Sequence, residues 1–263
     1  SLQDNILKQV HTDYIRAGSQ IITTNTYASS RIMLKSAGFE KRFEEVNLKA
    51  VNSALKAREE TGYKDVIIAG SISHRYPIAD GDTKSNASIQ VSKLELQEAT
   101  EEMALLLTNN GCDIILLEMM YRPERMKIIF DIVKKLNIPI WVCFSCRKSD
   151  KGEILSLTDE TVVPFSEMIA ISKEYNFDAW GIMHTSEDIL GECIKMIKAN
   201  FNGPILAYPD TGGWISPNWI FDSVIEPEKF REKANGWFAL GAQIIGGCCG
   251  TSPDHIRALA TLK

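Results

Sequence analysis

The sequence of 263 residues has no apolar stretch that approaches the roughly 20 residues needed for a membrane-spanning helix. Its beginning also lacks a signal-peptide pattern, so we expect a protein of the cytoplasm. Basic residues are not in excess, because 29 Lys and Arg stand against 34 Asp and Glu, for a formal net charge of −5. Without a cluster of Lys and Arg, this composition argues against nucleic acid as a partner.

Cysteine is too sparse for a dense disulfide framework in a chain of this length. The six cysteines are Cys112, Cys143, Cys146, Cys193, Cys248 and Cys249. Adjacent cysteines rarely bond to each other because the geometry is strained. Cys248 and Cys249 therefore point to metal or thiol chemistry, with two small buried side chains as the alternative.

Repeats, low-complexity tracts and linkers are also absent, and we predict one domain over residues 1–263. No Gly-rich phosphate fingerprint follows an early strand, which argues against a dinucleotide-binding sheet. Instead, short apolar runs with little polar alternation predict strands buried on both faces. These runs are Gln20–Tyr27, Asp65–Ser73, Cys112–Met120, Ile138–Ser145, Phe177–His184, Pro204–Asp210 and Ala242–Gly250.

Helical patterns alternate with these seven runs. They cover Ile6–Ala17, Arg31–Thr61, Val91–Asn110, Pro123–Leu136, Val163–Tyr175, Ser186–Asn200, Pro227–Leu240 and Pro253–Leu262, with loops expected at Asp80–Ser88 and Gly213–Asp222. The alternation predicts the α/β class and favours a (β/α)8 barrel of the TIM type. Because the first element is a helix, we expect the first strand of such a barrel to be lacking from this chain.

Active sites of these barrels lie at the carboxyl ends of the strands. At the carboxyl ends of the predicted strands lie Glu118, Met183-His184, Tyr208 and Cys248-Cys249. Glycines on both sides of the cysteine pair let the backbone turn sharply and aim both sulfurs at one point. Two thiolates at about 2.3 Å from a metal suit zinc. A tight turn with two incidental cysteines is the alternative.

The final segment closely resembles the terminal motif of the homocysteine S-methyltransferase family. It reads Gly246-Gly247-Cys248-Cys249-Gly250-Thr251-Ser252-Pro253-Asp254-His255-Ile256-Arg257-Ala258-Leu259. Further stretches resemble the same family along essentially the whole chain: His11-Thr12-Asp13-Tyr14, Ile21-Ile22-Thr23-Thr24-Asn25-Thr26-Tyr27, Ala69-Gly70-Ser71-Ile72, Leu116-Leu117-Glu118 and Tyr208-Pro209-Asp210.

The resemblance implies a (β/α)8 barrel with a zinc ion on three protein thiolates and homocysteine sulfur as the fourth ligand. It also implies transfer of an activated methyl group to that sulfur, which gives methionine. Such a reaction needs activation of the acceptor, because a free thiol with a pKa of about 8.5 is mostly protonated at neutral pH. A coordinating thiol is instead deprotonated. The chain has no room for cobalamin or folate modules, so a small donor such as S-methylmethionine, S-adenosylmethionine or betaine, or a separate partner protein, is expected.

One metal ligand departs from the family. Its first zinc cysteine follows the sixth strand in a Gly-hydrophobic-Asn-Cys motif, and Gly181-Ile182-Met183-His184 stands in that place. Imidazole is a good zinc ligand, and two cysteines with one histidine form a known open site. We expect His184 to be the third ligand, with a hydrogen-bonded strand-end histidine as the alternative and Cys146 as a minor rival. A neutral ligand makes the site less negative, so it should bind a substrate thiolate more readily and leave it less nucleophilic.

Four further side chains are candidates for substrate binding. Glu118 stands where the family's glutamate contacts the homocysteine ammonium, although an ion pair with Arg122 or Arg125 would also explain it. Asn25, Ser71 and Tyr208 could bond to substrate or to neighbouring backbone. The family's first strand also carries an Asp-Gly-Gly motif, which the chain lacks.

Two other functional classes stay open. One is a family member without catalysis that binds metal or thiol. The other is a closed structural zinc site that uses Cys143 and Cys146. The sequence is also compatible with a homo-oligomer.

Overall fold

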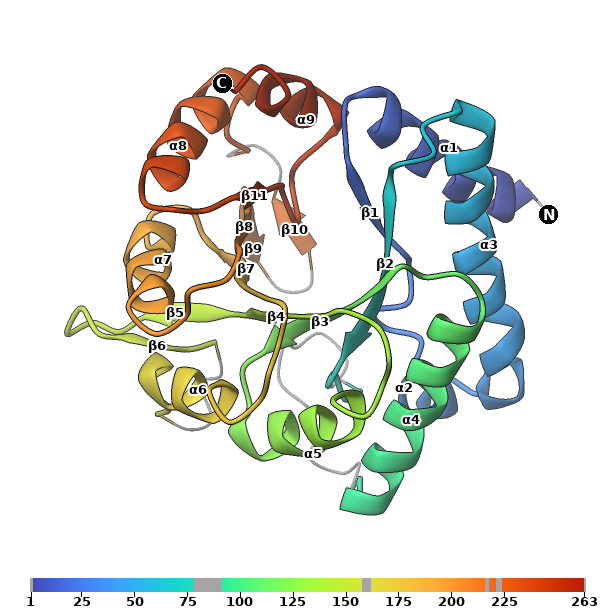
Figure 1. Ribbon diagram of the computed structural model, residues 1–263. Coiled ribbons are helices and arrows are strands. Elements are labelled where there is room, and N and C mark those ends of the chain that lie inside the picture. Colours follow the sequence, from blue (N-terminus) through green and yellow to red (C-terminus); the bar gives the residue numbers. More distant parts are fainter. Residues whose placement is uncertain (1, 78–90, 158–161, 216–217, 221–223, 263) are drawn as a thin grey trace. The chain divides into compact units, whose positions relative to one another are not determined.

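The computed structural model describes residues 2–77, 91–157, 162–215, 218–220 and 224–262 (Figure 1). Its internal contacts group into two compact units. Unit 1 comprises Ser1–Leu117 and Ile128–Ile140, and unit 2 comprises Glu118–Lys127 and Trp141–Lys263. The prediction of one domain is not tested by this grouping and stays a prediction. The expected loop at 80–88 lies outside the described residues.

Unit 1 contains the parallel strands that follow the first helix. They are β1 (Ile21–Thr23), β2 (Ile67–Ser73) and the first part of β3 (Ile114–Met120), in that order. Ile21 pairs with Ile67 and Ile22 with Ile68. All residues of β3 are buried, as the continuous apolar run predicts for a strand covered on both faces.

Unit 2 continues the same alternation with four parallel strands. Their order is β4 (Ile140–Phe144), β7 (Ala179–Ser186), β8 (Ile205–Asp210) and β11 (Ile244–Ile245). The core beside β7 is aromatic, because Trp180 stacks on Phe201 at a ring-centroid distance of 4.6 Å and meets Phe144 edge to face. This packing fixes the strand whose end carries His184.

The helices connect these strands and cover them. In unit 1 they are α1 (Leu2–Arg16), α2 (Arg31–Ser36), the 3-10 helix η1 (Glu40–Arg42), α3 (Phe43–Thr61) and α4 (Lys93–Asn109), and α5 (Pro123–Val133) has residues in both units. In unit 2 they are α6 (Phe165–Ser172), α7 (Leu190–Lys198), α8 (Pro227–Ala239) and α9 (Pro253–Leu259). Helix α1 lies beside α3, and α8 lies beside α9 (Figure 1). In the described part of the chain, no helix combines the length and the apolar character that crossing a membrane requires.

All seven predicted strands are present, but two expectations about other segments are wrong. The single helix expected over 31–61 is interrupted after Ser36, where Gly38 takes a left-handed φ of 75° that ends the first part. The expected loop at 213–222 contains an antiparallel pair, β9 (Gly213–Ile215) and β10 (Asn218–Ile220). A second pair, β5 (Cys146–Lys148) and β6 (Ile154–Ser156), was not predicted.

Candidate metal centre

The turn after β11 presents two cysteines, and hydrogen bonds to the end of β8 fix it. The backbone N–H of Cys248 donates to the Pro209 carbonyl at 2.9 Å, and that of Thr211 donates to the Cys249 carbonyl at 2.8 Å. Gly250 has a φ of 80°, and a side chain there would collide with the Thr211 carbonyl. Glycine is therefore required at this position for both its backbone conformation and its lack of a side chain. The predicted sharp turn between the last strand and α9 is confirmed.

The end of β7 presents His184 through an irregular backbone. The pairing of β7 with β8 shifts register between Met183 and Ser186, and His184 has a φ of 43°. Such a conformation is uncommon without glycine, although histidine tolerates it better than most residues. Its position is held by the Met183 carbonyl, which accepts from Ser145 Oγ at 3.0 Å and from Thr185 Oγ1 at 2.8 Å.

These two segments bring three metal-binding side chains together. The ligand atoms of His184, Cys248 and Cys249 all lie within 4.8 Å of one another. The two sulfurs are 3.8 Å apart, and each is 3.9 Å from Nδ1 of His184. Tetrahedral zinc with the usual bond lengths of about 2.3 Å to sulfur and 2.0 Å to nitrogen requires edges of roughly 3.5–3.8 Å. The donor set therefore fits a zinc ion with little movement.

The pKa values of the two thiols shift in opposite directions. Cys248 donates to the sulfur of Cys249, and this bond, with a smaller contribution from His184, lowers the pKa of Cys249 to about 5. The same bond and burial raise the pKa of Cys248 well above its usual range. The lowered pKa favours the thiolate form of Cys249, and a thiolate favours binding of a cation at this point.

Asp210, at the end of β8, adds a negative charge beside the imidazole. Its Oδ2 lies 3.7 Å from Nδ1 of His184. Burial raises the pKa of the Asp210 carboxyl, while His184 acts in the opposite direction. Because Nδ1 is also the nitrogen that faces the two sulfurs, the carboxylate adds its negative charge where a cation would bind.

Glu118 lies at the end of β3 in the same unit, among groups that restrict it. It is 7% exposed, and the Tyr208 hydroxyl donates to its Oε1 at 3.3 Å. Burial raises the pKa of the Cys143 thiol, which also bonds to Tyr208. Glu118 in turn contributes to the raised pKa of Cys248. Glu118 and Tyr208, predicted separately from two strand ends, are thus in contact within unit 2.

The other predicted residues are outside the group of three metal-binding side chains. Asn25 is exposed in the turn after β1, and Ser71 is fully buried within β2, both in unit 1. Cys143 and Cys146 do not join any group of three or more metal-binding side chains among the described residues. Cys146 instead bonds to the thiol of Cys193, and burial raises its pKa. The closed structural zinc site with Cys143 and Cys146 and the ligand role of Cys146 are therefore wrong, because both sulfurs are buried in the core.

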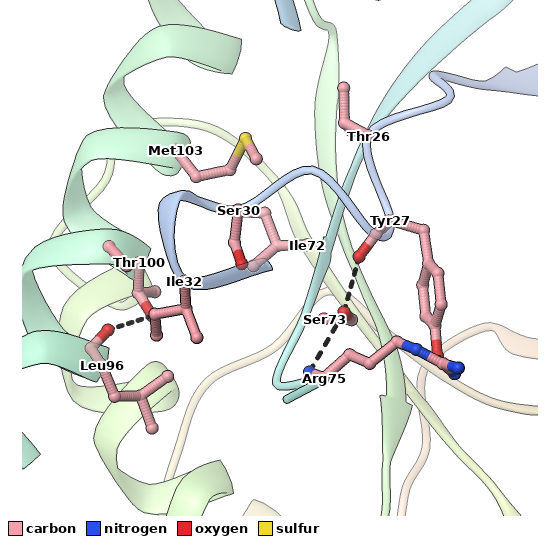
Figure 2. A pocket seen from close by; sticks show the side chains of 11 residues that line it. Thr26, Tyr27, Ser30, Ile32, Ile72, Ser73, Arg75, Leu96, Thr100 and Met103 are labelled. Atoms are coloured by element: carbon pink, nitrogen blue, oxygen red, sulfur yellow. Dashed lines mark hydrogen bonds between the residues drawn. The ribbon is translucent and has the colours of Figure 1, made fainter. Parts of the chain in front are cut away.

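Unit 1 has a pocket of its own, between α4, α2 and the end of β2 (Figure 2). Its wall contains no His, Cys, Asp or Glu, so it has no ligand set for a metal. Its hydroxyl groups are occupied within the wall: Ser73 Oγ donates to the Tyr27 carbonyl at 2.7 Å and accepts from the Arg75 backbone at 3.3 Å. The Arg75 guanidinium lies over the Tyr27 ring, 5.8 Å from its centre. Among the described residues, the group that could hold a metal ion belongs to unit 2.

Sequence reasoning missed the residues that support these side chains. Ser145, Thr185 and the thioether of Met183 have no motif that marks them. The only available signal was their position at or just beyond predicted strand ends.

Comparison with known proteins shows the family of the chain. The family model described as homocysteine S-methyltransferase matches residues 2–262. Homocysteine S-methyltransferase 2 from Zea mays is 28% identical over 97% of this chain and 79% of its own length. The selenocysteine methyltransferase of Astragalus bisulcatus is 25% identical over 97% of this chain and 81% of its own length.

Solved structures show the same fold. The homocysteine methyltransferase MmuM from Escherichia coli, in its oxidized form, matches 97% of this chain and 84% of its own with a TM-score of 0.78 at 23% identity. Its metallated form matches 96% of this chain and 83% of its own with a TM-score of 0.76. The predicted α/β class with (β/α)8-type alternation is confirmed, with seven of its parallel strands in the described residues. The chain is a methyltransferase of the homocysteine S-methyltransferase family.

Proposed function

We propose that this protein is a zinc-dependent S-methyltransferase that moves a methyl group from a small activated donor to homocysteine, giving methionine. The observation that carries the proposal is the triangle of Cys248, Cys249 and His184, with edges of 3.8, 3.9 and 3.9 Å. Three protein ligands leave a tetrahedral ion one open position, which is typical of catalytic rather than structural zinc.

The chain's own residues would hold the ion and leave that position to the acceptor. When bound, zinc supplies a deprotonated acceptor sulfur at neutral pH, because a coordinating thiol loses its proton. Two thiolates and a neutral His184 balance the charge of the ion, whereas three thiolates would exceed it by one. This neutral site favours binding of the acceptor thiolate and reduces its nucleophilicity.

Glu118 and Tyr208 would position the other end of the acceptor. Homocysteine carries an ammonium group three carbon atoms away from its sulfur, and a buried carboxylate is the natural partner of that cation. The Tyr208 hydroxyl donates to Glu118 and so restricts the carboxylate to one orientation. The acceptor would thus be held at both ends, which aligns its sulfur for attack.

The reaction then needs an activated methyl donor, such as a sulfonium or a quaternary ammonium compound. The acceptor sulfur forms a bond to the methyl carbon while the bond from that carbon to the donor's sulfur or nitrogen breaks. The bonding electron pair stays on the donor, which leaves as a neutral sulfide or amine. We also propose that residues 1–263 form one catalytic domain in the cytoplasm. The substrate-binding roles of Asn25 and Ser71 stay predictions.

A selenol is the second candidate acceptor. The relative from Astragalus bisulcatus is named selenocysteine methyltransferase. A selenol is more acidic than a thiol, so it depends less on activation. Metal ligands that reduce the acceptor's nucleophilicity would therefore slow methyl transfer to selenocysteine less than transfer to homocysteine.

Metal analysis and calorimetry test the proposal. Zinc-loaded protein should contain one zinc per chain, bind homocysteine with release of a proton, and form methionine when S-methylmethionine, S-adenosylmethionine or betaine is added. The variants His184→Ala and Cys249→Ser should lose zinc. Cys193→Ala is the matched control, because this buried cysteine of unit 2 lies outside the triangle.

Unchanged zinc content in His184→Ala would remove the histidine from the ligand set. Thiol binding without methionine formation from any donor would favour a member that binds thiols without catalysis.

A further inference from the structure

Two residues of unit 2 have a backbone conformation that side chains normally avoid. Among the described residues other than glycine, only Met119 (φ 52°) and His184 (φ 43°) have a positive φ. Met119 directly follows Glu118, and His184 directly follows Met183. Such conformations persist only where surrounding contacts hold them, and they cluster at functional sites.

The contact that holds Met119 comes from the neighbour of His184. The backbone N–H of Met119 donates to Sδ of Met183, with a nitrogen–sulfur distance of 3.1 Å. Both methionines are buried, at 8% and 4% exposure. A thioether is a weak acceptor, yet here it satisfies a buried backbone donor that would otherwise be costly to leave unpaired.

Met183 is itself fixed by hydrogen bonds to its carbonyl group. Ser145 Oγ and Thr185 Oγ1 both donate to that oxygen, and Thr185 Oγ1 also accepts from the Cys146 backbone at 2.9 Å. Ser145 and Thr185 are 0% and 1% exposed, so water does not compete for these bonds. The carbonyl of the peptide between Met183 and His184 is therefore held by two buried donors.

From this arrangement we infer that Met183 is a positioning residue that sets the separation between the acceptor's two anchors. The backbone of Met183 leads directly into His184, which would bind the metal and, through it, the acceptor's sulfur. The sulfur of Met183 holds the backbone of Met119, next to Glu118, which would bind the acceptor's ammonium group. The inference rests on the proposed function, because it assigns an ammonium group to Glu118 and a sulfur to the metal.

Loss of the Met183 sulfur should weaken the contact between Glu118 and the acceptor's ammonium group and leave the metal site unchanged. His184 is anchored through the Met183 carbonyl, which any residue at position 183 retains. Leucine is the appropriate replacement, because Leu and Met have similar volume and such exchanges are the best tolerated in a core. Glutamine restores an acceptor at a similar distance from the backbone.

The experiment compares two thiols by calorimetry on the zinc-loaded protein. Homocysteine has the ammonium group, and 4-mercaptobutanoate has the same thiol and carboxylate without it. For Met183→Leu we expect the dissociation constant of homocysteine to rise roughly tenfold, as for loss of a partner of one buried donor. The constant for 4-mercaptobutanoate and the zinc content should not change. Met183→Gln should recover most of the affinity, and Met168→Leu, at a fully buried methionine of α6, should behave as the unchanged protein.

Each other outcome overturns a specific step. Unchanged homocysteine binding in Met183→Leu, or an equal loss for both thiols, would show that the sulfur does not position Glu118. Equal binding of both thiols by the unchanged protein would instead refute the ammonium role of Glu118 and, with it, this inference. Absence of thiol binding altogether would refute the proposed function.

Discussion

The hydroxyl of Tyr208 lies 3.3 Å from Oε1 of Glu118, although the two residues are 90 positions apart in the sequence. The contact joins the end of β8 to the end of β3 within unit 2. The same end of β8 includes Asp210, and backbone hydrogen bonds of Pro209 and Thr211 hold the turn with Cys248 and Cys249. One strand end therefore supports both the Glu118 carboxylate and the two sulfurs.

Replacement of Tyr208 by phenylalanine tests what the hydroxyl contributes. Tyr208→Phe keeps the ring and removes the donor to Glu118. A typical hydrogen bond is worth about 0.5–1.5 kcal/mol, so KM for homocysteine should rise about fivefold. The value of kcat should change less, because the hydroxyl donates to the carboxylate and makes no hydrogen bond to the sulfur of Cys248 or Cys249 in the described residues. Steady-state kinetics measures both constants.

Tyr63→Phe is the control for this exchange, since the Tyr63 side chain is 58% exposed in unit 1. An unchanged KM in Tyr208→Phe would mean that Glu118 is oriented without the hydroxyl.

Exchange of His184 for cysteine tests the charge argument. His184→Cys would give three thiolates and a site more negative by one charge. Charges about 4 Å apart interact by several kcal/mol even in a polar protein environment, so the dissociation constant of homocysteine should rise about tenfold or more. The bound sulfur should react faster in a single turnover. Slower transfer together with tighter binding would contradict the argument.

Asp210 offers a test of the charge beside the histidine. Asp210→Asn removes the carboxylate 3.7 Å from Nδ1 of His184 and keeps the shape of the side chain. Since charges about 4 Å apart interact by several kcal/mol even in a polar protein environment, loss of this negative charge should weaken zinc binding about tenfold or more. Competition with a chromophoric chelator measures the zinc affinity. Asp254→Asn removes an exposed charge from the first turn of α9 and should leave the affinity unchanged.

The strands, and the meeting of His184, Cys248 and Cys249 at one point, were predictable from the sequence because each depends on local chemistry. An uninterrupted apolar run such as that of β3 suits only a strand covered on both faces. The cysteine pair, its glycines and His184 stand at the ends of such runs, where a (β/α) fold places its active site.

The supporting contacts were not predictable, because they depend on partners far away in the chain. The left-handed backbone of Met119 has no local cause and exists through its bond to Met183, 64 positions later. Likewise, the break after Ser36 in an otherwise helical pattern follows from Gly38, a residue that a helix can also tolerate. The family comparison could not supply these contacts either, since it aligns residue types and not bonds.

A buried histidine outside the site should make the stability of the fold depend on pH. His11 of α1 is 6% exposed, and its Nε2 has no hydrogen-bond partner among the described residues. Burial lowers the pKa of His11 from 6.5 to about 4. As the pH falls below 6.5, the unfolded chain binds a proton that the folded chain refuses until about pH 4. Stability is therefore complete above pH 6.5 and is lost as the pH falls toward 4.

Between pH 7 and pH 5 this loss should amount to about 2 kcal/mol, from a pKa difference of roughly 2.5. His11→Leu removes the titrating group and the unpaired nitrogen, so it should lose less stability over this interval and be no less stable at pH 7. Urea unfolding of both proteins at the two pH values measures the difference. The metal-binding residues also titrate, but they are identical in both proteins and cancel in the comparison. If both proteins lost the same free energy of unfolding between pH 7 and pH 5, His11 would have to be protonated in the folded state, which its burial without a hydrogen-bonding partner for Nε2 argues against.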